Sequence, residues 1–431
     1  MAGRSFRFAH LADAHVGAWP REPAVRGALR TSVLRALEVV EERGCEFLLV
    51  SGDLFHTPVP EPAEVAPVAA RLRRLVAAGC RVYVIYGSHD YVAHRVSWLD
   101  VLAESGLFLR AAPEPVRAEG DRWSLRFTVD GPTGAVIAGI SGRSHGLDAA
   151  YFRSVDSEAF RAQPGFHIFQ FHAAIREYLP PPLREHIEGI SREDLPPGCA
   201  YYAGGHIHFT YEGSGPDGGL LVNPGAVFGT SITDLEHAAR RETHQGVAIV
   251  SVTQGEPSVE FVDTAPTERI TILDVDVDGK APSEARALVS DRLAAARRPG
   301  ALVFSRVHGK LAEGDPAAGG FGALAHAKEE SSESVTLDLS DLVLTAAGGS
   351  AERRSEAELE LEMVRRLSTE APAELVELHG SAGEERIRQL LRELGWPRSE
   401  GQAALDYRQE RTDAALALLR PPRARPVTPE A

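Results

Sequence analysis

Five short fragments of the sequence carry histidine and aspartate in patterns suited to metal chemistry. Each follows a run of apolar residues that predicts a β-strand, so each stands where a strand ends. In open α/β sheets, the loops beyond the carboxyl ends of the strands form the crevice that binds ligands. We expect the following residues to meet there: Asp13 and His15 in HLADAHVG, Asp53 in VSGDLFH, Ser88, His89 and Asp90 in YGSHDY, His172 in FQFHAA, and His206 and His208 in GGHIH.

The residue types in this set indicate a pair of divalent ions. Carboxylate oxygen and imidazole nitrogen suit manganese, iron or zinc, whereas an all-oxygen set would favour magnesium or calcium. Asp13 and His15 are close enough in the chain to reach one ion, and so are His206 and His208. The set exceeds what one ion with an open coordination position needs. We therefore expect two ions about 3.5 to 4 Å apart, with Asp53 as the bridging carboxylate.

Glycines accompany the predicted ligands. Gly52, Gly87 and Gly205 stand immediately or almost immediately before them, where the chain leaves a strand and must turn tightly. A single Gly-Asp pair at a strand end is usually an ordinary turn. The recurrence of acids or histidines at the strand ends of all five fragments favours a shared site.

A two-ion centre of this kind suits the hydrolysis of phosphate esters. The anionic oxygens of a phosphodiester repel a nucleophile, and two divalent ions can neutralise them and acidify a water molecule near pH 7. In-line attack also needs charge stabilisation on the leaving side, which a protonated imidazole can supply. We therefore predict metal-dependent phosphodiester hydrolysis.

Length and composition set the broad class. A chain of 431 residues should hold two or three domains. The 46 basic and 61 acidic residues give a net charge of −15, which argues against bulk attraction to nucleic acid or anionic membranes but allows a local basic groove. Three cysteines, Cys45, Cys80 and Cys199, form no disulfide framework and fit a reducing compartment.

The sequence predicts a cytoplasmic protein. No run approaches the eighteen or so apolar residues of a membrane-spanning helix, and the amino terminus lacks the apolar core of a secretory signal. We therefore expect no contact with a membrane.

The hydrophobic pattern predicts a layered α/β sandwich, with mixed central sheets flanked by helices. Amphipathic patterns predict helices over 23–43 and 62–78, with a shorter helical pattern over 96–106. Apolar runs that predict successive strands follow at 123–129, 135–141, 166–172, 200–208, 219–227, 246–252 and 258–263.

The pattern of apolar and polar residues changes near Ala265. An edge strand over 269–279, a helix over 283–298 and a strand over 301–311 predict a small α+β domain. This domain extends to about Thr345. From Ser350 onward the pattern is helical and ends in a Pro-rich tail that we expect to be disordered. The predicted domains are 1–265, 266–345 and 346–431.

The order of these motifs resembles that of the calcineurin-like metallophosphoesterases over roughly the first 265 residues. Within that superfamily, HLADAHVG, SGDLFH, GGHIH and the NPGAV segment are most similar to the SbcD-type nuclease subunit of the double-strand-break-repair complex. The resemblance implies a metallophosphoesterase nuclease core over 1–265. It also implies that 266–345 is a capping domain that helps position DNA and that 346–431 binds an ATPase.

The resemblance also implies roles for single residues. The ligands of one ion would be Asp13, His15, Asp53 and His208, and those of the other Asp53, Ser88, His172 and His206. His89 would be the catalytic histidine, Asp90 its orienting partner, and His56 would face the substrate. Position 88 departs from the family, which usually has asparagine there. A serine hydroxyl is shorter and a weaker metal donor, and it can act through water.

The resemblance implies a Mn²⁺-dependent DNA enzyme, with exonuclease action on double-stranded ends and endonuclease action on single strands. The partners would be an SbcC-type coiled-coil ABC ATPase and, through the helical patterns that flank YGSHDY, a second copy of the chain. Two alternatives stay open. The acidic net charge favours a metallophosphatase or cyclic-nucleotide phosphodiesterase, and a second ion weakened by Ser88 favours a structural adaptor for the ATPase.

Overall fold

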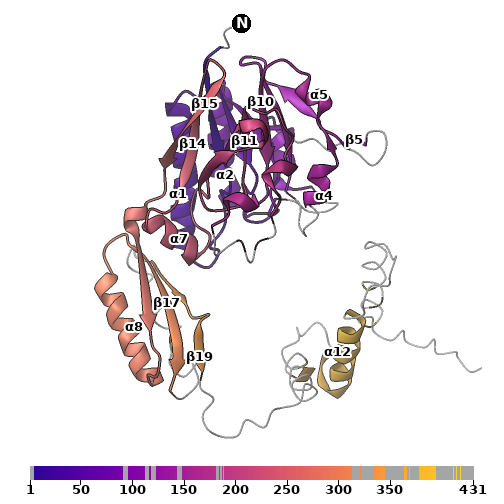
Figure 1. Cartoon of the computed structure of the whole chain (residues 1–431). Helices are drawn as coiled ribbons and strands as arrows, with labels where there is room; N and C mark the ends of the chain where they lie inside the picture. Colours follow the sequence, from indigo (N-terminus) through magenta and orange to yellow (C-terminus); the bar gives the residue numbers. More distant parts are fainter. Residues whose placement is uncertain are drawn as a thin grey trace, which may run out of the picture. The chain divides into compact units, whose positions relative to one another are not determined.

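A computed structural model describes the chain at residues 4–90, 96–111, 116–117, 123–142, 148–180, 189–312, 334–344 and 378–394, and at single positions elsewhere. The chain forms two compact units, residues 1–345 and 346–431 (Figure 1). The Pro-rich tail from 421 and most of the helical pattern over 351–368 lie outside the described residues.

The first unit contains two six-stranded mixed sheets, which confirms the predicted layered α/β class (Figure 1). In the first sheet, four parallel strands are extended at β1 by an antiparallel hairpin, in the order β15, β14, β1, β2, β3, β4. These strands are β1 (Phe6–Leu11), β2 (Phe47–Ser51), β3 (Arg81–Ile85), β4 (Leu109–Arg110), β14 (Gly246–Thr253) and β15 (Glu256–Asp263).

The second sheet has a parallel centre between two antiparallel edge strands, in the order β12, β13, β11, β10, β8, β7. Its strands are β7 (Phe127–Val129), β8 (Ala135–Ile140), β10 (Phe166–Phe171), β11 (Tyr201–Ala203), β12 (Tyr211–Ser214) and β13 (Leu220–Asn223). The parallel strands of both sheets end near one another, and the loops that follow them carry the predicted site.

An apolar layer joins the two sheets. Phe8 of β1 stacks on Phe47 of β2 with ring centroids 4.8 Å apart. Tyr201 of the second sheet meets Phe8 edge to face at 5.1 Å. Because a shift of one residue would turn these rings away from the layer, their burial fixes which residues of each strand face the other sheet.

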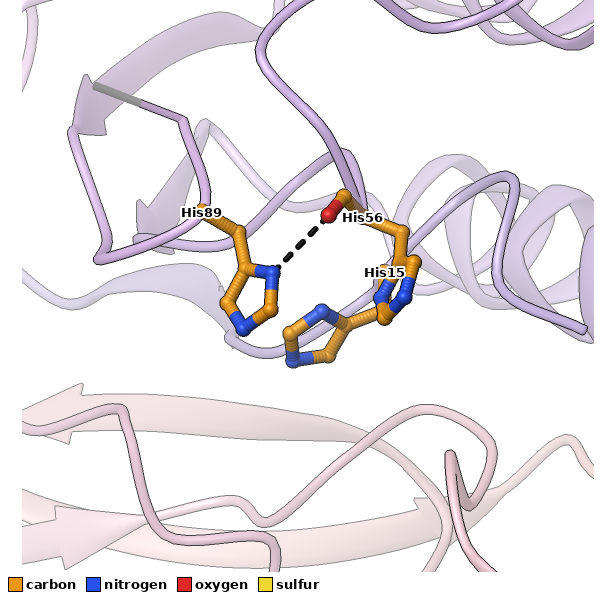
Figure 2. Close-up of side chains that lie close together, drawn as sticks. All are labelled: His15, His56 and His89. Carbon is orange, nitrogen blue, oxygen red and sulfur yellow. Dashed lines mark hydrogen bonds between the residues drawn. The ribbon is translucent and has the colours of Figure 1, made fainter. Parts of the chain in front are cut away.

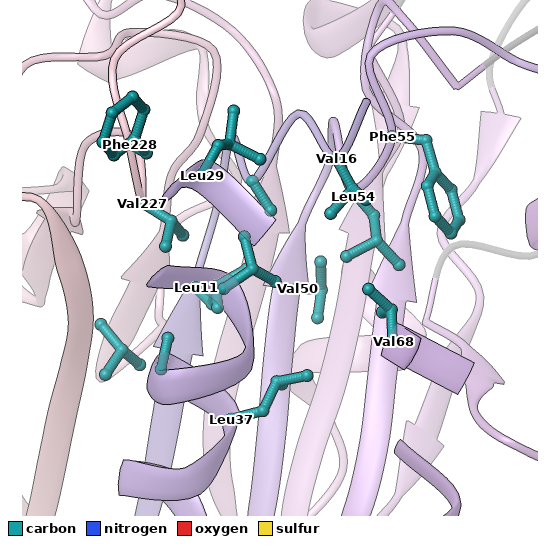
Figure 3. Packing of buried hydrophobic residues seen from close by; sticks show 14 of the residues in the cluster. Leu11, Val16, Leu29, Leu37, Val50, Leu54, Phe55, Val68, Val227 and Phe228 are labelled. Atoms are coloured by element: carbon teal, nitrogen blue, oxygen red, sulfur yellow. The ribbon is translucent and has the colours of Figure 1, made fainter. Parts of the chain in front are cut away.

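Helices cover the outer faces of both sheets. On the first sheet lie α1 (Pro23–Glu42), α2 (Pro62–Ala77) and α3 (Trp98–Glu104), and on the second α4 (Asp148–Arg153) and α5 (Glu158–Arg161). Figure 3 shows Leu29 and Leu37 of α1 packed over Leu11 and Val50 of the strands. Proline at the first helical position starts both α1 and α2, since its fixed φ suits that place.

Three of the predicted strands differ from the structure. The run over 219–227 is a strand only as β13, which ends at Asn223. The run over 123–129 is two strands: β6 (Trp123–Ser124) pairs with β5 (Val116–Arg117) and β9 (Val155–Asp156) in a separate small sheet, whereas β7 belongs to the large one. The run over 200–208 is extended only as β11, because two consecutive glycines follow Ala203 and the chain turns into the site.

A smaller parallel sheet follows within the first unit. It contains β16 (Ile270–Asp276), β17 (Leu302–Leu311), β18 (Ser334–Asp338) and β19 (Leu342–Leu344), with α8 (Pro282–Ala296) packed on it. It packs against the part of the unit that contains the two larger sheets. There α7 (Ile232–Ala239) contacts β16, and the ring of Trp19 lies 5.5 Å from that of Phe304 in β17. The domain boundary at residue 265 stays a prediction.

The second unit contains α12 (Gly380–Leu394), which lies within the helical region expected from the sequence. Across the part of the chain that the structure describes, none of the helices has both the length and the apolarity needed to cross a membrane.

Asp130 links the two large sheets and gives a test of the packing. It accepts two hydrogen bonds of 2.8 Å from the Arg81 guanidinium and one of 2.8 Å from the Tyr83 hydroxyl. Burial alone would raise the pKa of this carboxyl, but Arg81, Thr133 and Tyr83 outweigh burial and hold the pKa below its usual value. The ionised form therefore stabilises the fold above about pH 4, and this contribution is lost as the pH falls through the lowered pKa.

We expect Asp130→Asn to lower the free energy of unfolding near pH 7 by roughly 2 to 4 kcal/mol, because the Arg81 charge loses its buried partner. The difference between variant and wild type should shrink when unfolding is measured near pH 3. Urea denaturation at the two pH values checks this. A difference independent of pH would show that shape, not charge, holds the sheets together here.

Candidate metal centre

The structure brings the predicted fragments together at one edge of the two sheets. The ligand candidates come from loops that follow β1, β2 and β3 of the first sheet and β10 and β11 of the second. The loops after β1 and β2 are bound to each other, because the backbone N–H of Asp13 donates to Gly52 and that of His15 donates to Asp53. The backbone thus builds one cradle from segments far apart in the sequence.

The backbone at four of these residues is left-handed. Their φ angles are 50° at Asp13, 43° at His15, 51° at Asp53 and 89° at His206. Residues with a side chain rarely adopt this region, and such strain gathers at functional sites. The fold holds these side chains at an energetic cost, which supports a role beyond packing.

The glycines act in two different ways. Gly52 has a φ of 90°, so the predicted need for a tight turn holds there. Gly87 has no positive φ; instead, a Cβ on it would lie 2.0 Å from Oδ1 of Asp53. The absence of a side chain at Gly87 therefore allows the loop after β3 to approach the Asp53 carboxylate closely.

One group of possible ligands consists of Asp13, His15 and His208. The Nε2 atoms of His15 and His208 are 3.0 Å apart. The Nε2 atom of His15 also lies 3.9 Å from Oδ1 of Asp13 and 3.7 Å from Oδ2 of Asp53. These atoms surround one point that a single ion can occupy.

A second group consists of Asp13, Asp53 and His172. Oδ2 of Asp53 lies 3.2 Å from Nε2 of His172 and accepts a hydrogen bond of 3.2 Å from the Ser88 hydroxyl. The ring of His206 lies 5.0 Å from that of His172, centroid to centroid. Asp53 borders both groups, as the position of a bridging carboxylate requires.

The donor set fits divalent cations. Nδ1 of His172 donates to the Ser51 carbonyl at 2.9 Å, so in the neutral ring Nε2 is a lone pair buried against a carboxylate. Nδ1 of His208 meets the Asp234 carboxylate at 2.9 Å, which leaves its Nε2 lone pair facing His15. Facing lone pairs and carboxylates in a buried site are stabilised by a shared cation.

The charges in the site are strongly perturbed. Burial raises the pKa of Asp13 to about 6. Burial works the other way on His172, but the carboxylates of Asp53 and Asp13 outweigh it and raise the pKa of His172 to about 10. Burial and the nearby His208 lower the pKa of His15 well below its usual value. Such crowding of titratable groups is typical of functional sites.

Two further imidazoles, His56 and His89, lie beside His15 of the first ligand group, on its more exposed side (Figure 2). The His89 ring is 4.8 Å from that of His15 and stacks at 5.1 Å on that of His56. Nδ1 of His89 donates to the backbone carbonyl of His56 at 2.8 Å, which leaves Nε2 for a ligand or substrate. The backbone N–H of His89 donates to Asp53 at 2.8 Å and so ties it to the ligand groups.

Asp90 differs from the expectation that it orients His89. Its carboxylate accepts hydrogen bonds from the backbone N–H groups of Gly87 at 2.9 Å and Phe55 at 3.2 Å. Burial and the nearby Asp53 raise its pKa to about 7. Asp90 therefore holds the loop together, and the His56 carbonyl orients the His89 ring.

Sequence reasoning missed Asp234. Its Oδ2 accepts from His208 and also from the backbone N–H groups of Thr230 and Ser231 at the start of α7. The Ser-x-x-Asp pattern at Ser231 does signal the start of a helix. It gave no indication that the same carboxylate would fix the ring of His208, a candidate metal ligand 26 residues away.

Comparison with known proteins agrees with this geometry. Residues 6–209 match the model of the calcineurin-like phosphoesterase family. The chain is 28% identical over 233 residues to the DNA double-strand break repair protein Mre11 of Archaeoglobus fulgidus, covering 51% of this chain and 50% of that protein. It is 25% identical over 283 residues to the protein of the same name from Methanopyrus kandleri, covering 62% and 59%.

A third relative, the uncharacterized metallophosphoesterase YhaO of Bacillus subtilis, is 26% identical over 275 residues, covering 59% of each protein. The chain thus spans about half to three fifths of the length of these relatives. The matched family segment contains every predicted ligand from Asp13 to His208. Residues 6–209 therefore form a calcineurin-like phosphoesterase domain.

Proposed function

We propose that this chain is a two-metal phosphodiesterase that cleaves DNA in double-strand-break repair. One observation carries the proposal: Asp53 lies between two groups of buried acids and imidazoles that converge from both sheets. Two divalent ions held there would neutralise a phosphodiester and activate water. Of the possible phosphate esters, we favour DNA because two of the relatives above are named as DNA double-strand break repair proteins.

We propose a separate set of ligands for each of the two ions, with Asp53 common to both. We assign Asp13, His15, Asp53 and His208 to one ion, and Asp53, Ser88, His172 and His206 to the other. The donors suit Mn²⁺. The Ser88 hydroxyl donates its proton to Asp53, and its oxygen lone pairs remain available to an ion. We therefore propose that Ser88 also helps to orient Asp53.

His89 has the position of a general acid. Because its Nδ1 donates to the His56 carbonyl, the ring is fixed with Nε2 free to carry a second proton. A protonated Nε2 can donate to the oxygen that leaves when the phosphodiester is cleaved. His56, half-buried and stacked on His89, faces the same space and would contact the substrate.

The proposal is tested with purified chain, linear duplex DNA and Mn²⁺. Degradation that requires the ion supports a DNA exonuclease, and nicking of circular single-stranded DNA tests the endonuclease activity. Turnover of small phosphoesters with intact DNA would instead favour a phosphatase or cyclic-nucleotide phosphodiesterase. Binding of a coiled-coil ABC ATPase without hydrolysis would favour an adaptor.

A dimer surface is proposed on one side of the first sheet. Val59, Val96 and Val101 are 70%, 72% and 44% exposed. Their segments are adjacent, because the backbone N–H of Trp98 donates to the Pro58 carbonyl. Exposed apolar side chains gathered in one place are typical of an interaction site.

We expect the double variant Val96→Asp/Val101→Asp to be monomeric, with half the mass of the wild-type protein in light scattering, because two charges would be buried in the interface. Val129→Asp is a matched control on β7, where the valine is 49% exposed. A dimer that persists in the double variant would place the contact elsewhere.

The remaining partner is proposed from the resemblance and from α12. The helix carries Ile387 as a buried apolar residue and has charged residues at Glu384, Arg386 and Arg388. An amphipathic helix in this region suits docking against a helical partner, and we propose the base of an SbcC-type coiled-coil ABC ATPase. We place the protein in the cytoplasm, where the buried free thiols Cys45, Cys80 and Cys199 stay reduced.

A further inference from the structure

Asn223 is the single asparagine in a chain of 431 residues. The chain has serine even at position 88, where the family that it resembles usually has asparagine. Asn223 lies at the end of β13, fully buried, and starts the NPGAV segment. A residue type that occurs once and in the core of the molecule raises the question of what its side chain does there.

The side-chain amide of Asn223 is hydrogen-bonded to the loop that carries His208. Its Nδ2 donates to the backbone carbonyl of Ile207 at 2.6 Å and to that of Phe209 at 2.8 Å. These two carbonyls flank His208 on either side. The backbone N–H of Ala226 donates to the carbonyl of His208 itself at 3.3 Å, so three successive carbonyls are held from the same segment.

The chemistry of this contact requires an amide. Two carbonyl oxygens accept, so the group between them must donate twice, and the Asn223 NH₂ does so. The reverse orientation of the amide would place Oδ1 against both oxygens. Aspartate has the same shape but no N–H, and a serine hydroxyl donates only once. Buried carbonyls left without a donor cost roughly 1 to 3 kcal/mol each.

The ring of His208 is fixed independently from the opposite direction. Its Nδ1 is bound by Asp234 of α7, so Nε2 points to His15 at 3.0 Å. Asn223 sets where the backbone of His208 lies, and Asp234 sets how the ring is turned. Both are needed to place one nitrogen within a fraction of an ångström, which is the precision that a metal ligand demands.

We propose that Asn223 is a positioning residue for the ion held by Asp13, His15 and His208. The inference rests on the proposed two-ion function and deepens it. On this proposal, the affinity for one ion depends on an amide that itself touches no metal. The group of Asp53 and His172 is bound from other segments, so its ion should be held independently of Asn223.

The test measures Mn²⁺ binding without DNA, by titration calorimetry and by electron paramagnetic resonance, which distinguishes a coupled pair of ions from single ions. We expect Asn223→Asp to lower the affinity for one of the two ions by about 10- to 100-fold and to abolish the coupled signal, while the other ion binds as before. Asn223→Ser keeps the site neutral and one donor, and should show the same selective loss to a smaller extent.

Gln245→Glu is the matched control, since it also converts a buried amide to a carboxylate. We expect it to reduce thermal stability yet to leave both ions bound. If Asn223→Ser is folded and binds both ions with wild-type affinity, or if both ions are lost together, the positioning role is refuted. A wild-type protein that takes up no pair of ions refutes the proposed function itself, so the two failures are distinguishable.

Discussion

His89→Ala is expected to lower the rate of phosphodiester cleavage by about 10²- to 10⁴-fold while two ions stay bound, because the ring acts as a proton donor and not as a ligand. Its Nδ1 is already engaged by the His56 carbonyl, and its ring lies on the exposed side of the ligand groups. Cleavage assays under saturating Mn²⁺, together with elemental analysis of the same samples, measure both quantities.

The alternative has a structural basis of its own. His15, His56 and His89 lie close enough together to hold an ion by themselves (Figure 2). If metal content falls together with activity in His89→Ala, the residue belongs to the ligands. His244→Ala is the control, because that histidine is exposed, pairs with Asp263 and lies outside the ligand groups. It should leave both activity and metal content unchanged.

Gly87→Ala should remove both ions and reduce activity at least as strongly as the loss of His89. The added Cβ would lie 2.0 Å from Oδ1 and 2.4 Å from the backbone nitrogen of Asp53. Neither atom can move away without displacing the carboxylate that borders both ligand groups. Because one added methyl group would displace the carboxylate that both ligand groups share, we expect the number of bound ions per chain to fall from two to below one.

The control for Gly87→Ala is Gly27→Ala in α1. A Cβ on Gly27 meets open space, and alanine in a helix is favoured over glycine by roughly 1 kcal/mol. This variant should therefore be slightly more stable and fully active. Full metal occupancy in Gly87→Ala would show that Asp53 does not bridge the ions.

The elements that could be predicted from the sequence are those with local signals. The amphipathic patterns placed α1 and α2 within one residue of their observed ends, because proline starts each helix and its apolar stripe ends with it. The strand run over 123–129 was wrong because the chain changes sheets between Ser124 and Phe127. Alternation of apolar residues carries no information about which sheet a strand joins.

The candidate site, like the fold, could be predicted only in part. The sequence indicated the side chains that gather, because each follows a strand end. It could not indicate the groups that orient them: the His56 carbonyl on His89, the Ser51 carbonyl on His172, and Asp234 on His208. These contacts join segments 26 to 121 residues apart, and only the packed sheets bring them together.

The contact of Trp19 with the smaller sheet has a mechanical consequence. Trp19 follows His15 by four residues, donates its indole N–H to Gly229 and packs against Phe304 of β17. One short stretch of peptide therefore carries a candidate metal ligand at one end and an anchor for the smaller sheet at the other. We therefore expect a rotation of that sheet about the anchor to shift the peptide that carries His15, which would couple the tilt of the sheet to the geometry of the site.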